Sequence, residues 1–275
     1  MGHPAALGLS VMITSPQNDK VRHVRALQRR RRVRQRESRL VFEGVRLVEE
    51  TVRANVSPVF VFYTAQAVTD DRGSRLLESL RGMNVACVEV SDGVMDLCSD
   101  TETPQGILAV MSIPALSLPA CPTFTLVLDQ VRDPGNLGTI LRTSLAAGVE
   151  QVLLTPGTVD ATNPKVVRSA MGAHLYLPVA VLGWDAIAEA VAGCDAWLAE
   201  AGGGVRYTAV DWTRPVVIVV GGEAAGAGER ARTFAQGRVS IPMAPEVESL
   251  NTAVATAAIL FEVVRQRAAL AQERL

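Results

Sequence analysis

Three short segments of the sequence place polar side chains or glycines directly after an apolar run. The first follows the run 125–128 and holds Asn136, Gly138 and Arg142. A strand-to-helix turn leaves backbone amides without partners, so Asn136 and Gly138 are placed to face an anion, with Arg142 about one turn further along the helix. The alternative is an ordinary capped turn with an arginine on the surface.

The second segment is rich in glycine and follows the apolar run 216–220. It begins Gly221-Gly222-Glu223 and holds two further glycines before Glu229. Glycine lets a ligand approach the backbone closely. The segment matches neither GxGxxG nor the P-loop GxxxxGK[ST], which argues against a dinucleotide site and against an NTPase.

The third segment leads from Ile241-Pro242-Met243 to Ser249-Leu250-Asn251 at the start of the last expected helix. Ser249 is the expected N-cap of that helix, and a plain cap is the alternative to a functional role. Ligands of open parallel sheets bind at the carboxyl ends of the strands. If the three segments follow neighbouring strands, they form one site.

Other chemistries fit the sequence poorly. The cysteines have neither the CxxC spacing of a metal site nor the density of a disulfide framework, and the histidines lie outside HExxH and triad contexts. These residues are Cys87, Cys98, Cys121, Cys194, His3, His23 and His174. We therefore expect no metal and reduced thiols.

A dense basic segment lies near the start of the chain. Residues 20–39 hold ten lysines and arginines against one acidic residue, whereas the whole chain has a net charge of −1. The four consecutive arginines Arg29, Arg30, Arg31 and Arg32 cover every side of a helix and repel one another. A polyanionic backbone offsets such repulsion, since guanidinium groups bind phosphate oxygens and release counterions. The segment predicts binding of nucleic acid.

The order of apolar runs predicts two α/β domains. A helix from Asn18 to about Gln35 opens an N-terminal domain at 13–112, and the proline-rich segment 113–122 reads as a linker. A second domain at 123–275 alternates strands and helices, as in a parallel sheet covered on both faces. Its expected strands are 125–128, 151–154, 175–179, 196–198, 216–220 and a short one near 239, with a final helix from Leu250 to about Arg267.

Together the three segments resemble the signature of the SpoU (TrmH-type) RNA ribose 2′-O-methyltransferases of the SPOUT superfamily. The motifs that carry the resemblance are Asn136-x-Gly138-x-x-x-Arg142-Thr143, Gly221-Gly222-Glu223-x-x-Gly226, and Ile241-Pro242-Met243 followed by Ser249-Leu250-Asn251. The segment 163–173 also looks like the family. Phe42-Glu43-Gly44 and Pro104-Gln105-Gly106 resemble the ribosomal-protein-like RNA-binding domain that precedes the catalytic domain in many members.

The resemblance implies a trefoil-knotted parallel-sheet domain, a homodimer with each active site completed across the interface, and S-adenosylmethionine as the cofactor. General connection rules alone argue against a knot. The implied cofactor pocket extends over Ala199 to Gly204 and the motif loops, and the cofactor-binding residues are Ala199, Gly221, Gly222, Ile241, Met243 and Leu250. RNA would be bound by Arg29, Arg30, Arg31, Arg32, Lys165 and Arg168.

The resemblance also implies roles for the polar residues. Asn136, Ser249 and Asn251 would orient the ribose or the cofactor, and Glu223 would hold loops or Arg142 in place. A guanidinium is effectively always protonated, so we expect Arg142 to fix the phosphate beside the target ribose and to stabilise the developing oxyanion. The identity of the base stays open.

The expected function is therefore 2′-O-methylation of 23S ribosomal RNA. The alternatives are a tRNA substrate and a non-catalytic RNA-binding or ribosome-assembly factor. No apolar run reaches the length of a membrane helix, and residues 1–12 lack the basic flank and cleavage site of a secretory signal. We expect a cytoplasmic protein.

Overall fold

The computed structural model describes residues 12–223 and 226–273, so most of the expected leader, with His3, lies outside the described residues. The chain divides into two compact units, the first ending at Ile113 and the second beginning at Pro114. None of the helices within the described residues is long and apolar enough to cross a membrane.

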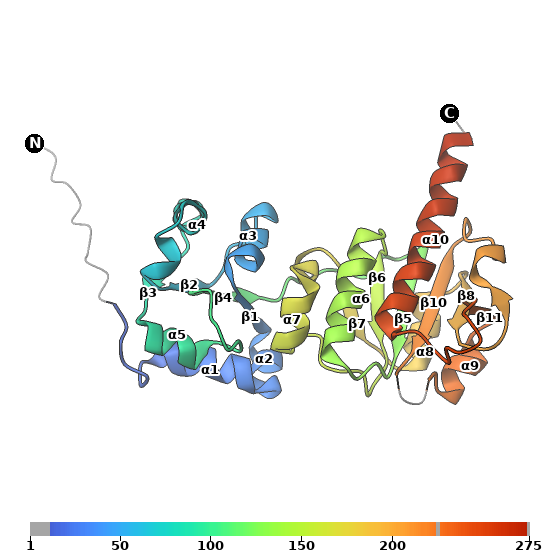
Figure 1. Cartoon of the computed structure of the whole chain (residues 1–275), viewed down its shortest axis with the longest axis horizontal. Helices are drawn as coiled ribbons and strands as arrows, with labels where there is room; N and C mark the ends of the chain where they lie inside the picture. Colours follow the sequence, from blue (N-terminus) through green and yellow to red (C-terminus); the bar gives the residue numbers. More distant parts are fainter. Residues whose placement is uncertain (1–11, 224–225, 274–275) are drawn as a thin grey trace, which may run out of the picture. The chain divides into compact units, whose positions relative to one another are not determined.

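The first unit is a small sheet with helices (Figure 1). Its elements are α1 (Asp19–Arg29), α2 (Arg31–Glu37), β1 (Arg39–Glu43), α3 (Val45–Arg53), β2 (Phe60–Tyr63), η1 (Gln66–Val68), α4 (Asp71–Gly82), β3 (Cys87–Glu89), α5 (Asp92–Cys98) and β4 (Ile107–Ser112). The strand order is β1-β4-β2-β3, with β4 antiparallel to both neighbours and β2 parallel to β3. Apolar residues of α1, α5 and the sheet share one core.

The expected continuous helix 18–35 is wrong in one respect, because the chain breaks at Arg30. Its backbone is extended there, with φ −122° and ψ 105°. Arg34 is buried and its Nη1 donates to the carbonyl oxygens of Leu27 at 2.9 Å and Gln28 at 3.3 Å. These contacts satisfy carbonyls that the end of α1 leaves without partners. The break also separates like charges along the arginine run.

The second unit is a seven-stranded sheet between helices. Its elements are β5 (Phe124–Asp129), α6 (Pro134–Ala146), β6 (Gln151–Leu154), α7 (Pro164–Ala170), η2 (Ala173–Leu175), β7 (Val179–Val181), α8 (Trp184–Ala190), β8 (Asp195–Ala199), β9 (Val205–Arg206), η3 (Tyr207–Ala209), β10 (Val216–Gly221), α9 (Glu229–Phe234), β11 (Gly237–Ser240) and α10 (Thr252–Glu273). The strand order is β7-β6-β5-β10-β8-β11-β9, and every pair is parallel.

Both faces of this sheet are buried. Ile218 of β10 packs in the core that includes residues of α6, α7 and α10, whereas Val217 and Val219 pack on the opposite face with Ile187 of α8 and Ala231 of α9. This alternation is the two-fold side-chain period of a strand. The predicted doubly covered parallel sheet is confirmed, and the knot stays a prediction.

One strand of the second unit lies elsewhere than expected. The sequence predicts a strand at 175–179, but η2 ends at Leu175 and β7 begins only at Val179. Met171 and Gly172 adopt positive φ values of 47° and 88° and end α7, after which the chain turns. Pro178 lacks an amide hydrogen, which favours a strand that begins after it.

Part of the expected linker packs on the second unit. Leu118 contacts the core that contains Ile187 and Cys194, and the Cys194 thiol donates to the carbonyl oxygen of Pro122 at 3.2 Å. The bounds 13–112, 113–122 and 123–275 stay predictions.

Candidate active site

The first motif places Asn136 in the first turn of α6. Asp133 is the N-cap, since its Oδ1 accepts from the Asn136 amide at 2.7 Å, and Pro134 occupies the start of the helix. The expected exposed amide at Gly138 is wrong, because Gly138 is buried inside α6. A Cβ there would lie 2.6 Å from the carbonyl oxygen of Val166, so this glycine permits close packing of α6 on α7.

The second motif follows β10, which lies beside β5 with Gly221 opposite Asp129. A Cβ on Gly221 would lie 2.3 Å from the Ala227 amide nitrogen, and one on Gly222 would lie 2.3 Å from the carbonyl oxygen of Gln130. The two glycines are therefore required by backbone packing between the first two motif loops, as well as by any approach of a ligand.

Three polar motif residues form a continuous chain of hydrogen bonds. Asn136 Nδ2 donates to Glu223 Oε1 at 2.8 Å, and Asn251 Nδ2 donates to Asn136 Oδ1 at 2.9 Å. Glu223 Oε2 also accepts from the Arg132 amide at 3.3 Å. Segments more than a hundred residues apart thus meet at the carboxyl edge of the sheet, as the sequence predicts.

The expected N-cap of the last helix is wrong. Asn251 Oδ1, not a Ser249 oxygen, accepts from the amides of Ala253 at 2.9 Å and Val254 at 3.2 Å, and α10 begins at Thr252. The Asn251 side chain therefore caps α10 with its oxygen and binds Asn136 with its nitrogen. Ser249 is an exposed residue on the pocket wall.

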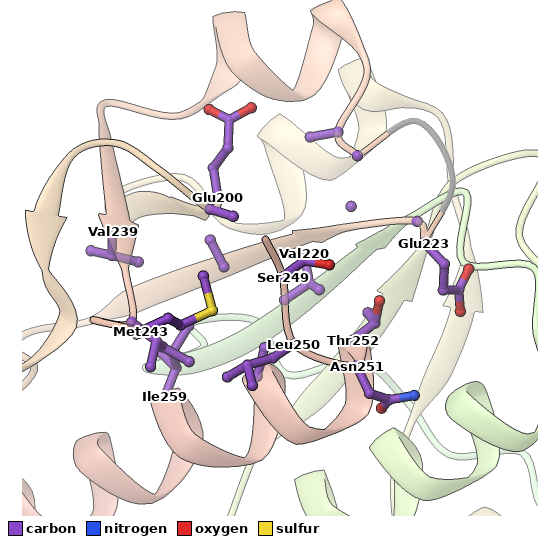
Figure 2. A pocket seen from close by; sticks show the side chains of 18 residues that line it. Glu200, Val220, Glu223, Val239, Met243, Ser249, Leu250, Asn251, Thr252 and Ile259 are labelled. Atoms are coloured by element: carbon purple, nitrogen blue, oxygen red, sulfur yellow. The ribbon is translucent and has the colours of Figure 1, made fainter. Parts of the chain in front are cut away.

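A cavity of about 540 Å³ lies beside this chain of hydrogen bonds (Figure 2). Residues from all the expected cofactor-binding positions line it, together with Glu223, Ser249 and Asn251; the six positions are Ala199, Gly221, Gly222, Ile241, Met243 and Leu250. The lining includes residues 199–201, but the expected contribution of 202–204 is not found. Figure 2 shows Glu223 and Asn251 at one end of the cavity and Glu200 at another.

Glu200 is a pocket residue that the sequence analysis missed. Its Oε1 accepts from Arg232 Nε at 3.1 Å and Nη2 at 2.8 Å, and Oε2 lies 3.4 Å from Arg238 Nη1. The available signal was an acidic residue directly after a strand that ends at Ala199, at the edge where ligands bind. Glu200 and Glu223 are the only charged residues of the described lining.

Arg142 lies apart from the pocket of its own chain. It is exposed on α6 and is absent from the pocket lining. Six residues of α-helix turn the chain through about 600°, so Arg142 points about 120° away from Asn136. Of the two expected roles for Glu223, the contacts shown are those that hold loops, through Asn136 and the Arg132 amide.

The expected RNA-binding residues occupy two surfaces. Lys165 is exposed on α7, and its Cε lies 4.0 Å from the place of a Cβ on Gly135, so its side chain reaches over the start of α6 beside Asn136. Arg168, half-buried, lies on the same helix. The other four, Arg29 to Arg32, are exposed on the first unit where α1 and α2 meet. No group of three or more potential metal ligands occurs among the described residues.

The two units match two known families. Residues 123–261 match the SpoU rRNA Methylase family, and residues 18–109 match the MRM3-like substrate binding domain. The chain belongs to the SpoU rRNA methylase family. The predicted membership, the methyltransferase class, the α/β fold and S-adenosylmethionine as the family's cofactor are confirmed.

Relatives of this SpoU protein match nearly its whole length. The 23S rRNA (guanosine(2553)-2′-O)-methyltransferase RlmP of Bacillus subtilis is 31% identical, over 91% of this chain and 98% of that protein. The 23S rRNA (uridine(2479)-2′-O)-methyltransferase of Streptomyces viridochromogenes is 31% identical, over 93% and 92%. The structure of the SpoU methyltransferase AviRb from S. viridochromogenes in complex with AdoMet has a TM-score of 0.81 at 27% identity, covering 92% of this chain and 99% of that chain.

Proposed function

We propose that this SpoU protein methylates a ribose 2′-hydroxyl of 23S ribosomal RNA. The observation that carries the proposal is the hydrogen-bonded chain Glu223–Asn136–Asn251 at the rim of the cavity. It joins the polar residues of all three motifs at one place. The relatives named above act on 23S rRNA riboses, which favours the same substrate class here.

The residues of the cavity suit S-adenosylmethionine. A volume of about 540 Å³ lies within the ordinary range for small-molecule sites. Gly221 and Gly222 leave the backbone open to adenine and ribose, while Ile241, Met243 and Leu250 supply apolar walls. The two carboxylates of the described lining favour a ligand with net positive charge. When bound, the cofactor supplies an electrophilic methyl group on a sulfonium.

The chain's own residues position the acceptor ribose. A hydroxyl reacts well only if it is held in line and gives up its proton. Both faces of the Asn136 amide are fixed, by Glu223 and by Asn251, and an amide keeps one further N–H and one lone pair for another partner. Asn136 therefore orients the ribose, Glu223 and Asn251 hold Asn136, and the Ser249 hydroxyl contacts ribose or cofactor.

Arg142 acts in a homodimer in this proposal. Large apolar side chains are exposed on α6 and α10, which pack together: Leu145 at 36%, Val254 at 56% and Phe261 at 49%. Val254 and Phe261 are seven residues apart and share one helix face. A second copy covering this face would bring the partner's Arg142 to the cavity, where the guanidinium binds the phosphate beside the target ribose and stabilises the oxyanion.

The basic side chains dock the RNA. Lys165, beside Asn136, is placed to contact the backbone near the target, and Arg29 to Arg32 add a second basic surface on the first unit. A cytoplasmic location and the absence of a metal stay predictions.

A methyl-transfer assay tests the proposal. Purified protein, radiolabelled S-adenosylmethionine and EDTA are combined with 23S rRNA or with tRNA, and single-turnover rates are measured. We expect transfer to 23S rRNA and a loss of 100-fold or more in Asn136→Ala. Asn18→Ala is the control, because Asn18 caps α1 through its Oδ1 in the other unit, and its rate should stay near that of the wild type.

Each other outcome has a definite meaning. Transfer to tRNA alone would favour the tRNA alternative. RNA binding without transfer to either RNA would favour the non-catalytic RNA-binding or ribosome-assembly factor.

A further inference from the structure

A buried carboxylate that the mechanism above does not use lies at the end of the central strand β5. Asp129 is 2% exposed, and it precedes the loop that carries the first motif. A buried carboxylate is costly unless hydrogen bonds compensate for the lost water. The partners of Asp129 therefore identify what this residue is placed to hold.

Both oxygens of Asp129 accept hydrogen bonds from neighbouring loops. Oδ2 accepts from the Gly228 amide at 2.8 Å, and Oδ1 accepts from the Thr155 hydroxyl at 2.8 Å. Thr155, also buried, accepts in turn from the Gln130 amide at 3.2 Å. Thr155 follows β6 and Gly228 follows β10, the two strands on either side of β5. One side chain thus ties together the loops of three adjacent parallel strands.

Gly228 ends the segment that forms one wall of the cofactor cavity. Gly221, Gly222, Glu223, Gly226 and Ala227 all line the cavity. The Gly226 amide donates to the Gly222 carbonyl oxygen at 3.1 Å, and Ala227 packs against Gly221 without room for a Cβ between them. Any shift of the Gly228 amide is therefore passed to the cavity wall.

The same segment carries Glu223, which binds Asn136. Its start is held by the pairing of Gly221 with β5, and Asp129 holds its end. Asp129 is itself absent from the described lining of the cavity. Its effect on the cofactor must act through Gly228.

We infer that Asp129 is a positioning residue for the cofactor site, fixing the wall formed by 221–223 and 226–228 through its bond to the Gly228 amide. The inference rests on the proposed function. It predicts that loss of the carboxylate weakens binding of S-adenosylmethionine, whereas the chemical step at saturating cofactor changes little. A merely structural role would lower stability and leave the affinity of the folded protein unchanged.

Three variants separate these roles. Asp129→Ala removes both acceptors and leaves the Gly228 N–H without a partner. Asp129→Asn keeps the volume, but it loses the charge and faces a donor toward one of two groups that donate to the carboxylate. Glu43→Ala is the matched control in the first unit, since Glu43 accepts from the Asp100 amide at 3.0 Å and from the hydroxyls of Ser99 and Thr101.

The test is calorimetric titration of S-adenosylmethionine into each full-length variant, with circular dichroism to show that it is folded. We expect the Kd to rise at least tenfold in Asp129→Ala and about threefold or more in Asp129→Asn, with that of Glu43→Ala within a factor of two of the wild type. Single-turnover rates at saturating cofactor and RNA should stay within about threefold of the wild type. If Asp129→Ala does not fold, Asp129→Asn decides.

A wild-type Kd in a folded Asp129→Asn or Asp129→Ala protein would overturn the inference. So would an equal rise in the Glu43→Ala control. A wild-type protein that binds no S-adenosylmethionine would instead contradict the proposed function, so the two failures are distinguishable.

Discussion

At the scale of single residues, the sequence predicted the cavity well and the connecting bonds poorly. The loops at Gly221 and Asn251 could be brought together because carboxyl ends of neighbouring parallel strands meet at one edge. Which atom bonds to which depends on side-chain geometry, so Asn251 and not Ser249 caps α10. Asp129 went unnoticed because an aspartate that ends a strand carries no motif of its own.

The first prediction concerns Arg142, which lies outside its own chain's cavity. Arg142→Ala should lower the single-turnover rate by about 100-fold or more, because it removes a charge that stabilises the transition state. The Kd for S-adenosylmethionine, measured by calorimetry, should stay near the wild-type value. A near wild-type rate would show that Arg142 has no part in the reaction.

The second prediction concerns His174, a buried imidazole. Its Nε2 donates to the Ala161 carbonyl oxygen at 2.7 Å and its Nδ1 has no partner in the described chain. Burial lowers the pKa of His174, opposed by the Ala161 hydrogen bond and by Asp160. Below about pH 6.5, its ordinary pKa, the unfolded chain takes up a proton that the folded protein does not. His174 therefore makes the free energy of unfolding fall as the pH falls.

Urea unfolding at pH 7.5, 6.5 and 5.5 measures this effect. Between pH 6.5 and 5.5 the wild type should lose more stability than His174→Gln, by at most about 1.4 kcal/mol per pH unit. The lowered pKa values of Glu37, Glu49 and Glu262 affect stability only at more acidic pH. Equal pH slopes for the two proteins would contradict the assignment.

At the scale of helices and strands, apolar runs predicted position better than continuity. The helix at 45–53 and the strand at 151–154 lie where the sequence places them. The break at Arg30 had no glycine or proline to announce it, since the contact of Arg34 with the end of α1 arises only on folding. The strand before Val179 failed because buried Leu175 and Leu177 lie in a turn.

The third prediction divides the arginines of α1 and α2 by role. Replacing Arg29, Arg30, Arg31 and Arg32 with glutamine should weaken RNA binding and reduce the slope of log affinity against log salt by about three to four. The Kd for S-adenosylmethionine should not change. Filter binding at several salt concentrations measures the slope.

Arg34→Gln is the contrasting variant. Because Arg34 is buried against α1, its loss should lower the free energy of unfolding by about 1 to 3 kcal/mol and leave the salt slope unchanged. An unchanged slope with reduced stability in the four-arginine variant would instead assign Arg29 to Arg32 a structural role.

At the scale of the whole molecule, alternating apolar runs were sufficient to predict two α/β units and the parallel sheet of the second. The mixed direction of the first sheet was beyond them, because the pairing direction of a strand is not encoded in its own apolar residues. The same limit applies to association between copies, for which the sequence offered only the family resemblance.

The fourth prediction tests the dimer through the exposed face of α10. Phe261→Asp should raise the dissociation constant of the dimer by about 100-fold or more, because the interface would bury an unpaired charge. Methyl transfer should fall with dissociation if the partner's Arg142 completes the site. Sedimentation velocity measures the mass, and Val181→Asp, at a valine that is 60% exposed on β7, is the control. A monomeric wild-type protein, or a Phe261→Asp dimer of unchanged affinity, would refute this interface.

The most direct test of the account is a map of 2′-O-methylated riboses on ribosomal RNA from cells with and without the gene. The account predicts that methylation of a 23S rRNA nucleotide is lost without the gene and returns with the wild-type protein, but not with Asn136→Ala. Identical 23S rRNA maps with and without the gene, or full restoration by Asn136→Ala, would contradict it.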